Sequence, residues 1–260
     1  MNETWLIARS VLIEAIRRKE IYAVVLVSSL LIGAVMTVDF FKLEGITKFY
    51  REVALQLMSA ATAITVIVLA ARQLPREFES RTIYPLLAKP ISRLLFLNGK
   101  LLGVMLAATF CFALFMGIYL LGSLYLGGEL PVLIFLQYLY LQMLKMLILA
   151  TLAFWLSMVM NLDAAITIAV IFFAAASILT NALTLLYDQA TPFGRVMLTI
   201  MNYTIPQLEI LDLSDKAVHT AEGTWGPLTL PVMLALTAYA LFFSGVYYGA
   251  AYFVFRRKPL

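Results

Sequence analysis

The sequence lacks the residues on which most metalloproteins and disulfide-rich proteins depend. Its 260 residues include one histidine and one cysteine. Cys111 lies in an apolar run and has no second cysteine to pair with, which excludes a disulfide framework. The single histidine, His219, is too few for a haem protein or a histidine-ligated metal centre. We therefore predict that the chain holds no metal.

Catalytic motifs are missing too. There is no G-x-S-x-G turn for a nucleophilic serine and no pair of carboxylates within an apolar run, so no catalytic residue is predicted. Gly99 and Lys100 resemble the end of a phosphate-binding P-loop, but that motif begins with a glycine and ends in serine or threonine. Leucines, Leu94 and Leu101, occupy those two positions here. We expect the chain itself to bind no cofactor.

Charge is scarce and apolar residues are abundant. Charged residues make up 13% of the chain and hydrophobic ones 63%, whereas soluble domains have about 25% and about 45–50%. A membrane-spanning helix needs about 20 apolar residues, so we predict an all-α integral membrane protein with six transmembrane helices. Residues 1–260 then form a single transmembrane domain without a sizeable soluble part. The six apolar runs fall at about 21–41, 52–74, 94–126, 131–160, 164–186 and 229–255.

The positions of lysine and arginine predict the orientation. Thirteen of them precede the first run, lie between the second and third runs or within the facing ends of these two, or follow the sixth; five lie in the other connections. Positive residues collect on the cytoplasmic side of a membrane. Both termini and the segment 75–92 are therefore predicted to be cytoplasmic. The net charge of +4 follows this topology and requires no nucleic-acid partner.

Two segments outside the runs are amphipathic. In residues 1–20, apolar side chains recur at helical spacing opposite charged ones, which predicts a helix in the membrane interface that also leads into the first span. The apolar side of this helix contains Trp5, Ala8, Leu12, Ala15 and Ile16.

The second amphipathic segment lies in residues 187–228, which we predict to be external and semi-apolar. Between Pro192 and Pro206 the pattern predicts a short helix on the outer membrane face, a re-entrant helix, or a helix that only packs against the spans. Its apolar positions are Phe193, Val196, Met197, Ile200 and Thr204. The acidic residues Asp188, Asp212 and Asp215 are interpreted as part of a solvated loop.

The charged stretch RQLPREFESRTIYPLLAKPISR, residues 72–93, separates the second and third runs. Pro75 is predicted to end the second span, and Thr82 and Ser92 to cap a short helix and the third span. Pro90 ends that short helix, which would lie across the cytoplasmic face. An ordinary basic loop that only anchors the topology explains the charges equally well.

The run REFESRTIYPLLAKPISRLLFLNGKLLG, residues 76–103, resembles the signature of permease subunits of ABC transporters of the type-2 exporter (ABC-2) family. The matching residues are Glu77 and Glu79, the Arg81-Thr82 pair, the stretch LLAKPISR, and Gly99-Lys100 with Gly103. An interfacial N-terminal helix, six spans and a semi-apolar segment before the last span agree with this resemblance over the whole chain.

The resemblance implies a coupling helix at about 76–90 that docks in a groove of a separate P-loop ATPase. Two copies of that ATPase would bind ATP and Mg²⁺ and act on two permease chains, expected to be a homodimer, in the inner membrane of a prokaryote. Charged contacts to the ATPase would come from Arg76, Glu77, Glu79 and Arg81, with Thr82 beside them. Phe78 and Tyr84 would be the apolar anchors.

One charge, Lys145, lies deep within an apolar run. It shares a helical face with Tyr138 and Gln142, which makes Gln142 and Lys145 candidates for lining a translocation path. Alternatively, Lys145 lies about two turns from the outer interface and extends outward to water. For the whole chain, an ATP-independent scaffold or subunit of a membrane complex is the alternative to a permease of an exporter.

Overall fold

The structure is a computed structural model. It describes residues 3–17, 46–79, 92–125, 132–187, 190–219 and 226–257, and also separate residues between 22 and 34. Side chains at 46–47, 78–79, 177–187, 201–204 and 219 lie outside this description. The described part is helical and contains no strand. Its elements are α1 (Glu3–Arg17), α3 (Ile46–Glu79), α5 (Arg93–Tyr125), α6 (Val132–Val159), α7 (Leu162–Tyr187), α8 (Pro192–Thr204), the 3₁₀ helix η2 (Leu208–Leu211), α9 (Ser214–His219) and α10 (Leu230–Arg257).

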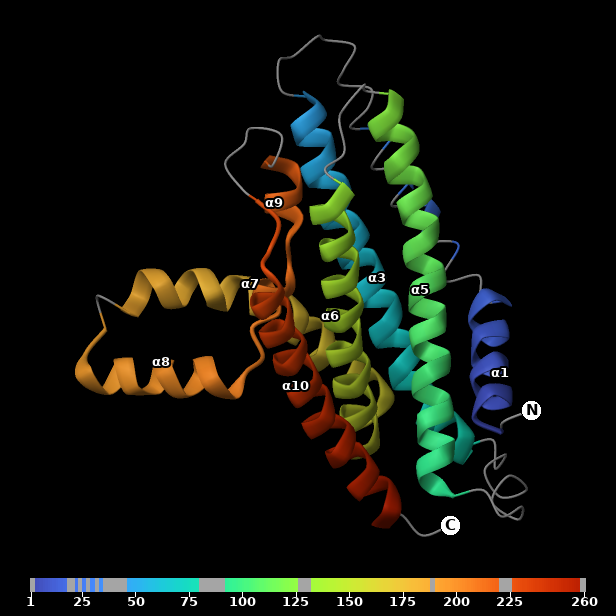
Figure 1. Ribbon diagram of the computed structural model, residues 1–260. Coiled ribbons are helices and arrows are strands. Elements are labelled where there is room, and N and C mark those ends of the chain that lie inside the picture. Colours follow the sequence, from blue (N-terminus) through green and yellow to red (C-terminus); the bar gives the residue numbers. More distant parts are fainter. Residues whose placement is uncertain are drawn as a thin grey trace.

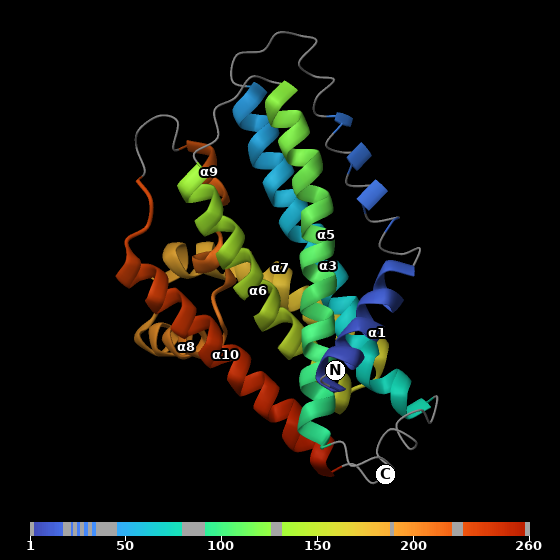
Figure 2. The ribbon, with the colours of Figure 1, turned by 45° about the vertical axis from the view of Figure 1, so that its right-hand side comes forward.

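Four of the described helices, α3, α5, α6 and α10, are long and apolar enough to cross a membrane. They form a bundle in which α6 lies between α3 and α10 and α5 packs on α3 (Figures 1 and 2). The prediction of an all-α, multi-pass membrane protein is confirmed. At 33 residues, α5 is about 50 Å long, which exceeds the hydrocarbon thickness of about 30 Å. The described residues between Tyr22 and Ala34, in the first predicted span, are helical too.

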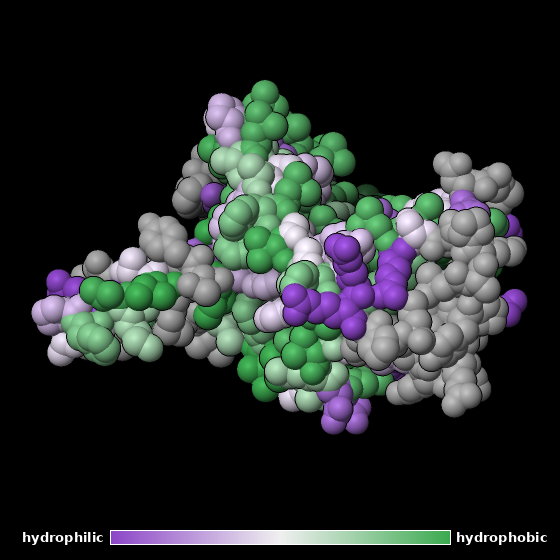
Figure 3. Space-filling view, turned by 90° about the horizontal axis from the view of Figure 1, so that it is seen from below, coloured by the Kyte–Doolittle hydropathy of each residue, from purple (hydrophilic) through white to green (hydrophobic). Residues whose placement is uncertain are grey.

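The C-terminal ends of α3, α6 and α10 meet the N-terminal end of α5 at one end of the bundle (Figures 1 and 2). Seen from this end, hydrophilic residues gather near the middle, with hydrophobic residues around them (Figure 3). The Ser92 hydroxyl accepts a hydrogen bond of 3.2 Å from the Leu95 amide, so the predicted N-cap of the third span is confirmed. Arg93 donates hydrogen bonds to the carbonyls of Phe255 and Arg256 at 3.0 and 2.7 Å. These two carbonyls at the C-terminal end of α10 have no partner within the helix, and Arg93 supplies one for each.

The prediction that Pro75 ends the second span is wrong. Pro75 lies inside α3, which continues to Glu79. Proline removes one backbone hydrogen bond and crowds one carbonyl of the preceding turn, but other contacts hold the last turns of this helix. Gln73 and Leu74 are buried, and Glu77 forms an ion pair with α5. The helix therefore extends beyond the apolar run.

Helix α1 forms within the predicted interval and runs beside the lower part of α5 (Figures 1 and 2). The face of α1 that is buried against the bundle contains Ala8 and Ala15 from the predicted apolar side together with Ile7 and Val11, whereas Trp5 is 51% exposed. The reason is the surface of α5, where two glycines admit α1 closely. A Cβ atom at Gly103 would lie 2.5 Å from Val11 Cβ and 2.9 Å from the Ala8 carbonyl oxygen, and one at Gly99 would lie 2.8 Å from Ile7 Cβ.

At the opposite end of the bundle, stacked aromatic rings join α3, α5 and α6. Tyr119 stacks on Tyr50 and Phe135, with ring centroids 6.4 and 5.5 Å apart, and Phe135 stacks on Tyr138 at 6.2 Å. The single cysteine, Cys111, is buried in α5 between these rings and the α1 contact. The apolar core thus runs along the whole of α5.

Helix α8 occupies the predicted interval and starts at Pro192. It projects sideways from the bundle together with the end of α7 (Figure 1). Its apolar stripe of Phe193, Val196, Met197 and Ile200 is 55–79% exposed, so the stripe does not pack against the described spans. The chain then returns to the bundle, where η2 and α9 contact α3, α6 and α7.

We expect Gly103→Ala to destabilise the protein by about 1–3 kcal/mol, because the added methyl group would overlap the α1 backbone. Gly117→Ala in the same helix is the control, since nothing lies within 4 Å of its Cβ position. Replacing that glycine should leave stability unchanged or raise it by up to about 1 kcal/mol. Unfolding in mixed detergents measures both. Equal effects of the two substitutions would contradict the close α1–α5 approach.

Candidate functional site

A buried ion pair joins α6 to the segment that follows α8. The Lys145 ammonium lies 2.7 Å from Asp212 Oδ2, and the two side chains are only 5% and 17% exposed. Lys145 also donates to the Ser59 hydroxyl of α3 at 3.3 Å, and its ammonium lies 5.5 Å from the centre of the Phe173 ring of α7. One lysine thus contacts α3, α7 and the returning segment.

Gln142, one turn before Lys145, completes this polar cluster. Its amide nitrogen donates to the Ser59 hydroxyl at 3.2 Å and to Asp212 Oδ2 at 3.3 Å. Tyr138, one further turn away, donates to the Leu55 carbonyl of α3 at 3.4 Å. The predicted polar face of the fourth span is therefore present and points at α3. We call Ser59, Gln142, Lys145 and Asp212 the membrane polar cluster.

Asp212 is oriented by its own segment. The Ser214 amide donates to Asp212 Oδ1 at 3.0 Å, which leaves Oδ2 for Lys145. Burial on its own would raise the pKa of the Asp212 carboxyl, but the charge and hydrogen bond of Lys145 and the hydrogen bonds from Ser214 outweigh it, so this pKa lies below its ordinary value. The carboxylate is thus charged at neutral pH.

Two interpretations of the sequence are corrected here. Asp212 is not part of a solvated loop, because Leu208, Leu211 and Leu213 around it are buried. Lys145 does not extend outward to water, because its ammonium ends on Asp212 inside the bundle. A buried ammonium needs a counter-charge, and the returning segment supplies it.

A second ion pair lies at the end of the bundle that carries Ser92 and Arg93. The Lys100 ammonium of α5 lies 2.6 Å from Glu77 Oε1 and 3.2 Å from Gln73 Oε1, both on α3. The Lys100 and Glu77 side chains are 6% and 19% exposed. This pair fixes the end of α3 to the start of α5, the two helices between which the predicted coupling segment lies.

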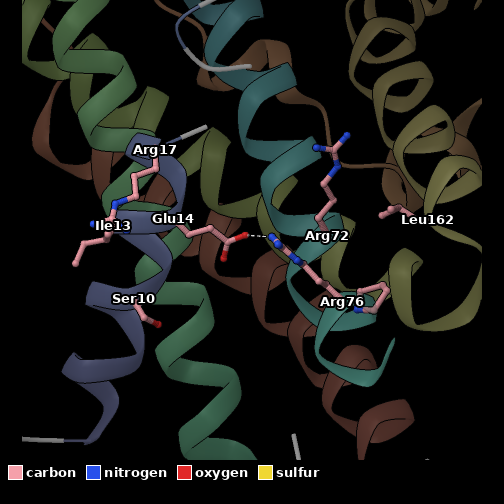
Figure 4. A pocket seen from close by; sticks show the side chains of 8 residues that line it. Ser10, Ile13, Glu14, Arg17, Arg72, Arg76 and Leu162 are labelled. Carbon is pink, nitrogen blue, oxygen red and sulfur yellow. Dashed lines mark hydrogen bonds and ion pairs between the residues drawn. The ribbon is translucent and has the colours of Figure 1, made fainter. Parts of the chain in front are cut away.

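Arg76 joins the same end of α3 to α1 through an ion pair with Glu14 (Figure 4). Two of the predicted ATPase contacts, Arg76 and Glu77, thus form ion pairs within the chain. The side chains of Phe78 and Glu79 and the whole of Arg81, Thr82 and Tyr84 lie outside the described residues. The coupling helix at 76–90 therefore stays a prediction.

Comparison with known families gives a match over nearly the whole chain. The family described as ABC-2 family transporter protein matches residues 7–260. The chain belongs to the ABC-2 family. It is the membrane permease of an ABC transporter, a transmembrane component that is not itself catalytic, and membership implies an ATPase subunit as partner. A search of curated proteins gave no match to this permease.

The sequence analysis missed four residues that hold these sites together: Glu14, Ser59, Lys100 and Asp212. A signal was available for Lys100, which lies within an apolar run of the permease next to a stretch with two glutamates. A charge within an apolar run needs a partner, and the nearby glutamates point to Glu77 as the partner of Lys100. For Asp212 no local pattern existed, because 67 residues separate it from Lys145.

Removing one member of the Lys145–Asp212 pair should destabilise the permease by about 3–5 kcal/mol, because the other charge is left buried and unpaired. We expect Lys145→Met and Asp212→Leu each to show this loss, and the double variant to lose much less than their sum. Asp215→Leu, three residues along and exposed, is the control and should have little effect. The free energy of unfolding in mixed detergents measures each variant, and additive losses would contradict a direct pair.

The lowered pKa of Asp212 determines how the contribution of the Lys145–Asp212 pair to folding stability depends on pH. The folded-state pKa lies below the unfolded value of about 3.9, so the contribution is complete above that value and is lost as the pH falls through the folded-state pKa. The stability difference between wild type and Asp212→Asn should therefore stay constant from pH 8 to about pH 5 and shrink below about pH 4. A difference that already shrinks between neutral pH and pH 6 would mean that the pKa is raised instead.

Proposed function

We propose that this permease works as a homodimer of an exporter with two copies of a separate P-loop ATPase. The ATPase would bind ATP and Mg²⁺, and the segment 76–90 would carry its movement to the membrane helices. Arg81, Glu79 and Thr82 would make polar contacts with the ATPase, and Phe78 and Tyr84 apolar ones. Arg76 and Glu77 would form the base of this segment inside the permease.

The observation that carries the proposal is the buried Lys100–Glu77 ion pair between α3 and α5. These helices flank the proposed coupling segment, so a force on the segment would act on both ends at once. The start of α5 also contacts α1 at Gly99 and Gly103 and α10 through Arg93. Displacement of the segment would therefore move the cytoplasmic ends of four helices together.

Helix α3 offers a route from the coupling segment to the membrane polar cluster. It carries Gln73 and Glu77 near one end, and Ser59 lies about 21 Å from Gln73 and about 27 Å from Glu77 at 1.5 Å per residue. A shift of α3 along α6 would break the contacts of Ser59 with Gln142 and Lys145, which are 3.2 and 3.3 Å long. We infer that Gln142 and Lys145 line the translocation path and that the Lys145–Asp212 pair closes it on the outer side.

The topology that we propose has six spans, with both termini on the cytoplasmic side of a prokaryotic inner membrane. Arg72, Arg76, Arg93 and Arg256 all belong to the end of the bundle that carries the coupling segment, in agreement with the positive-inside rule. The segment 187–228 would then lie on the outer side. Its exposed apolar helix α8 is suited to the outer membrane face.

The proposal is tested by purifying the tagged permease from its native membrane in mild detergent. We expect a P-loop ATPase, identified by mass spectrometry, to copurify and to hydrolyse ATP. Glu79→Lys and Arg81→Glu should each reduce the bound ATPase about tenfold or more, because a reversed charge at a docking contact repels its partner.

Asp215→Lys is the matched control, since it reverses an exposed charge in the proposed outer segment and should leave the ATPase bound. Absence of any P-loop ATPase would overturn the proposed coupling and favour an ATP-independent scaffold. If all three variants retained the ATPase equally, residues 79–81 would not belong to the docking surface.

A further inference from the structure

A cavity of about 840 Å³ opens between α1, the last turns of α3 and the start of α7 (Figure 4). Ligand pockets have volumes of about 300–1,000 Å³, so this space is large enough for a small organic molecule. The residues of its lining that matter here are Ile13, Glu14, Arg17, Arg72, Arg76 and Leu162.

The lining is strongly cationic. These residues include three guanidinium groups and one carboxylate, an excess of two positive charges. The carboxylate, Glu14, is engaged by Arg76. Arg17 of α1 and Arg72 of α3 bring two more guanidinium groups to opposite sides of the cavity (Figure 4). Guanidinium groups form paired, charge-assisted hydrogen bonds with phosphate oxygens, so phosphate is the anion that this lining fits.

The cavity also has an apolar residue at each of two opposite edges, and it lies at a particular depth (Figure 4). Ile13 and Leu162 belong to the lining, and Ile13 is 38% exposed. Leu162 is the first residue of α7, and Arg72 and Arg76 belong to the final turns of α3. The cavity therefore lies where the apolar helices reach the membrane surface. Cations beside apolar side chains at this depth match a phospholipid, whose phosphate adjoins its acyl chains.

We propose that this cavity binds the phosphate of an anionic phospholipid from the leaflet at this end of the bundle. Arg17 and Arg72 hold the phosphate, and the acyl chains run past Ile13 and Leu162 into the membrane. The lipid then connects α1 to α3 in parallel with the Glu14–Arg76 ion pair. This inference needs only the membrane-spanning fold and does not depend on the proposed ATPase coupling.

The test uses the full-length permease in mild detergent, together with any ATPase that it carries. Its unfolding temperature is followed as phosphatidylglycerol is added, with phosphatidylcholine of the same acyl chains and inorganic phosphate as reference probes. Native mass spectrometry counts the bound lipid. We expect phosphatidylglycerol to raise the unfolding temperature, because a ligand that binds only the folded state stabilises it, and neither reference probe to do so at the same concentration.

Arg17→Gln/Arg72→Gln should weaken phosphatidylglycerol binding about tenfold or more. Arg9→Gln is the matched control, because Arg9 is an exposed arginine of the same helix outside the cavity lining. If the double variant does not fold, the single variant Arg17→Gln serves as the test, because Arg17 is exposed and its replacement should not prevent folding. Loss of this guanidinium group should still weaken phosphatidylglycerol binding about threefold.

Three results would overturn the inference. Phosphatidylcholine carries the same phosphate but is neutral because of its choline cation, so equal stabilisation by it would show that the net negative charge of the lipid is not recognised. Equal stabilisation by inorganic phosphate would make the cavity a site for free phosphate and not for lipid. Unchanged phosphatidylglycerol binding in the arginine variants would place the lipid elsewhere on the protein.

Discussion

A charge inside an apolar helix bundle is stable only beside a partner, and this requirement shapes much of the permease. Lys145 and Lys100 each lie within an apolar run, and each ends on a carboxylate less than 3 Å away. For Lys145 the partner, Asp212, comes from outside the spans. The chain after α8 must therefore return to the bundle, and η2 and α9 form where it does so. The ion pair determines where this returning segment packs, and the buried leucines around Asp212 add apolar contacts to the bundle.

The two ion pairs lie at different depths, and the lysine of each pair also contacts α3. Lys100 connects α5 to α3 near one membrane surface, and Lys145 connects α6 to α3 through Ser59. Helix α3 thus contacts both sites. Buried ion pairs add little net stability compared with apolar residues of the same volume, but they permit few alternative arrangements. A helix held in this way has a small number of well-defined positions, which suits the movement that we propose for α3.

Local patterns in the sequence predicted local features well. The cap at Ser92, the helix that starts at Pro192 and the polar face of Tyr138, Gln142 and Lys145 all follow from the spacing of neighbouring residues. Features that depend on contacts between residues far apart in the sequence could not be predicted from such patterns. The buried face of α1 is chosen by glycines of α5, and the partner of Lys145 lies in another part of the chain. Pro75 remained helical for the same reason, because contacts from α5 hold the turn that follows it.

The single cysteine has a practical consequence for studying how this permease moves. Cys111 is buried in the middle of α5, so thiol reagents added to the folded protein meet no exposed native sulfhydryl among the described residues. A cysteine introduced at an exposed position then becomes the principal site of modification, without prior removal of a native residue. Fluorescent or spin labels placed in this way report distances in the otherwise natural sequence, including the distance between the two chains of the proposed homodimer.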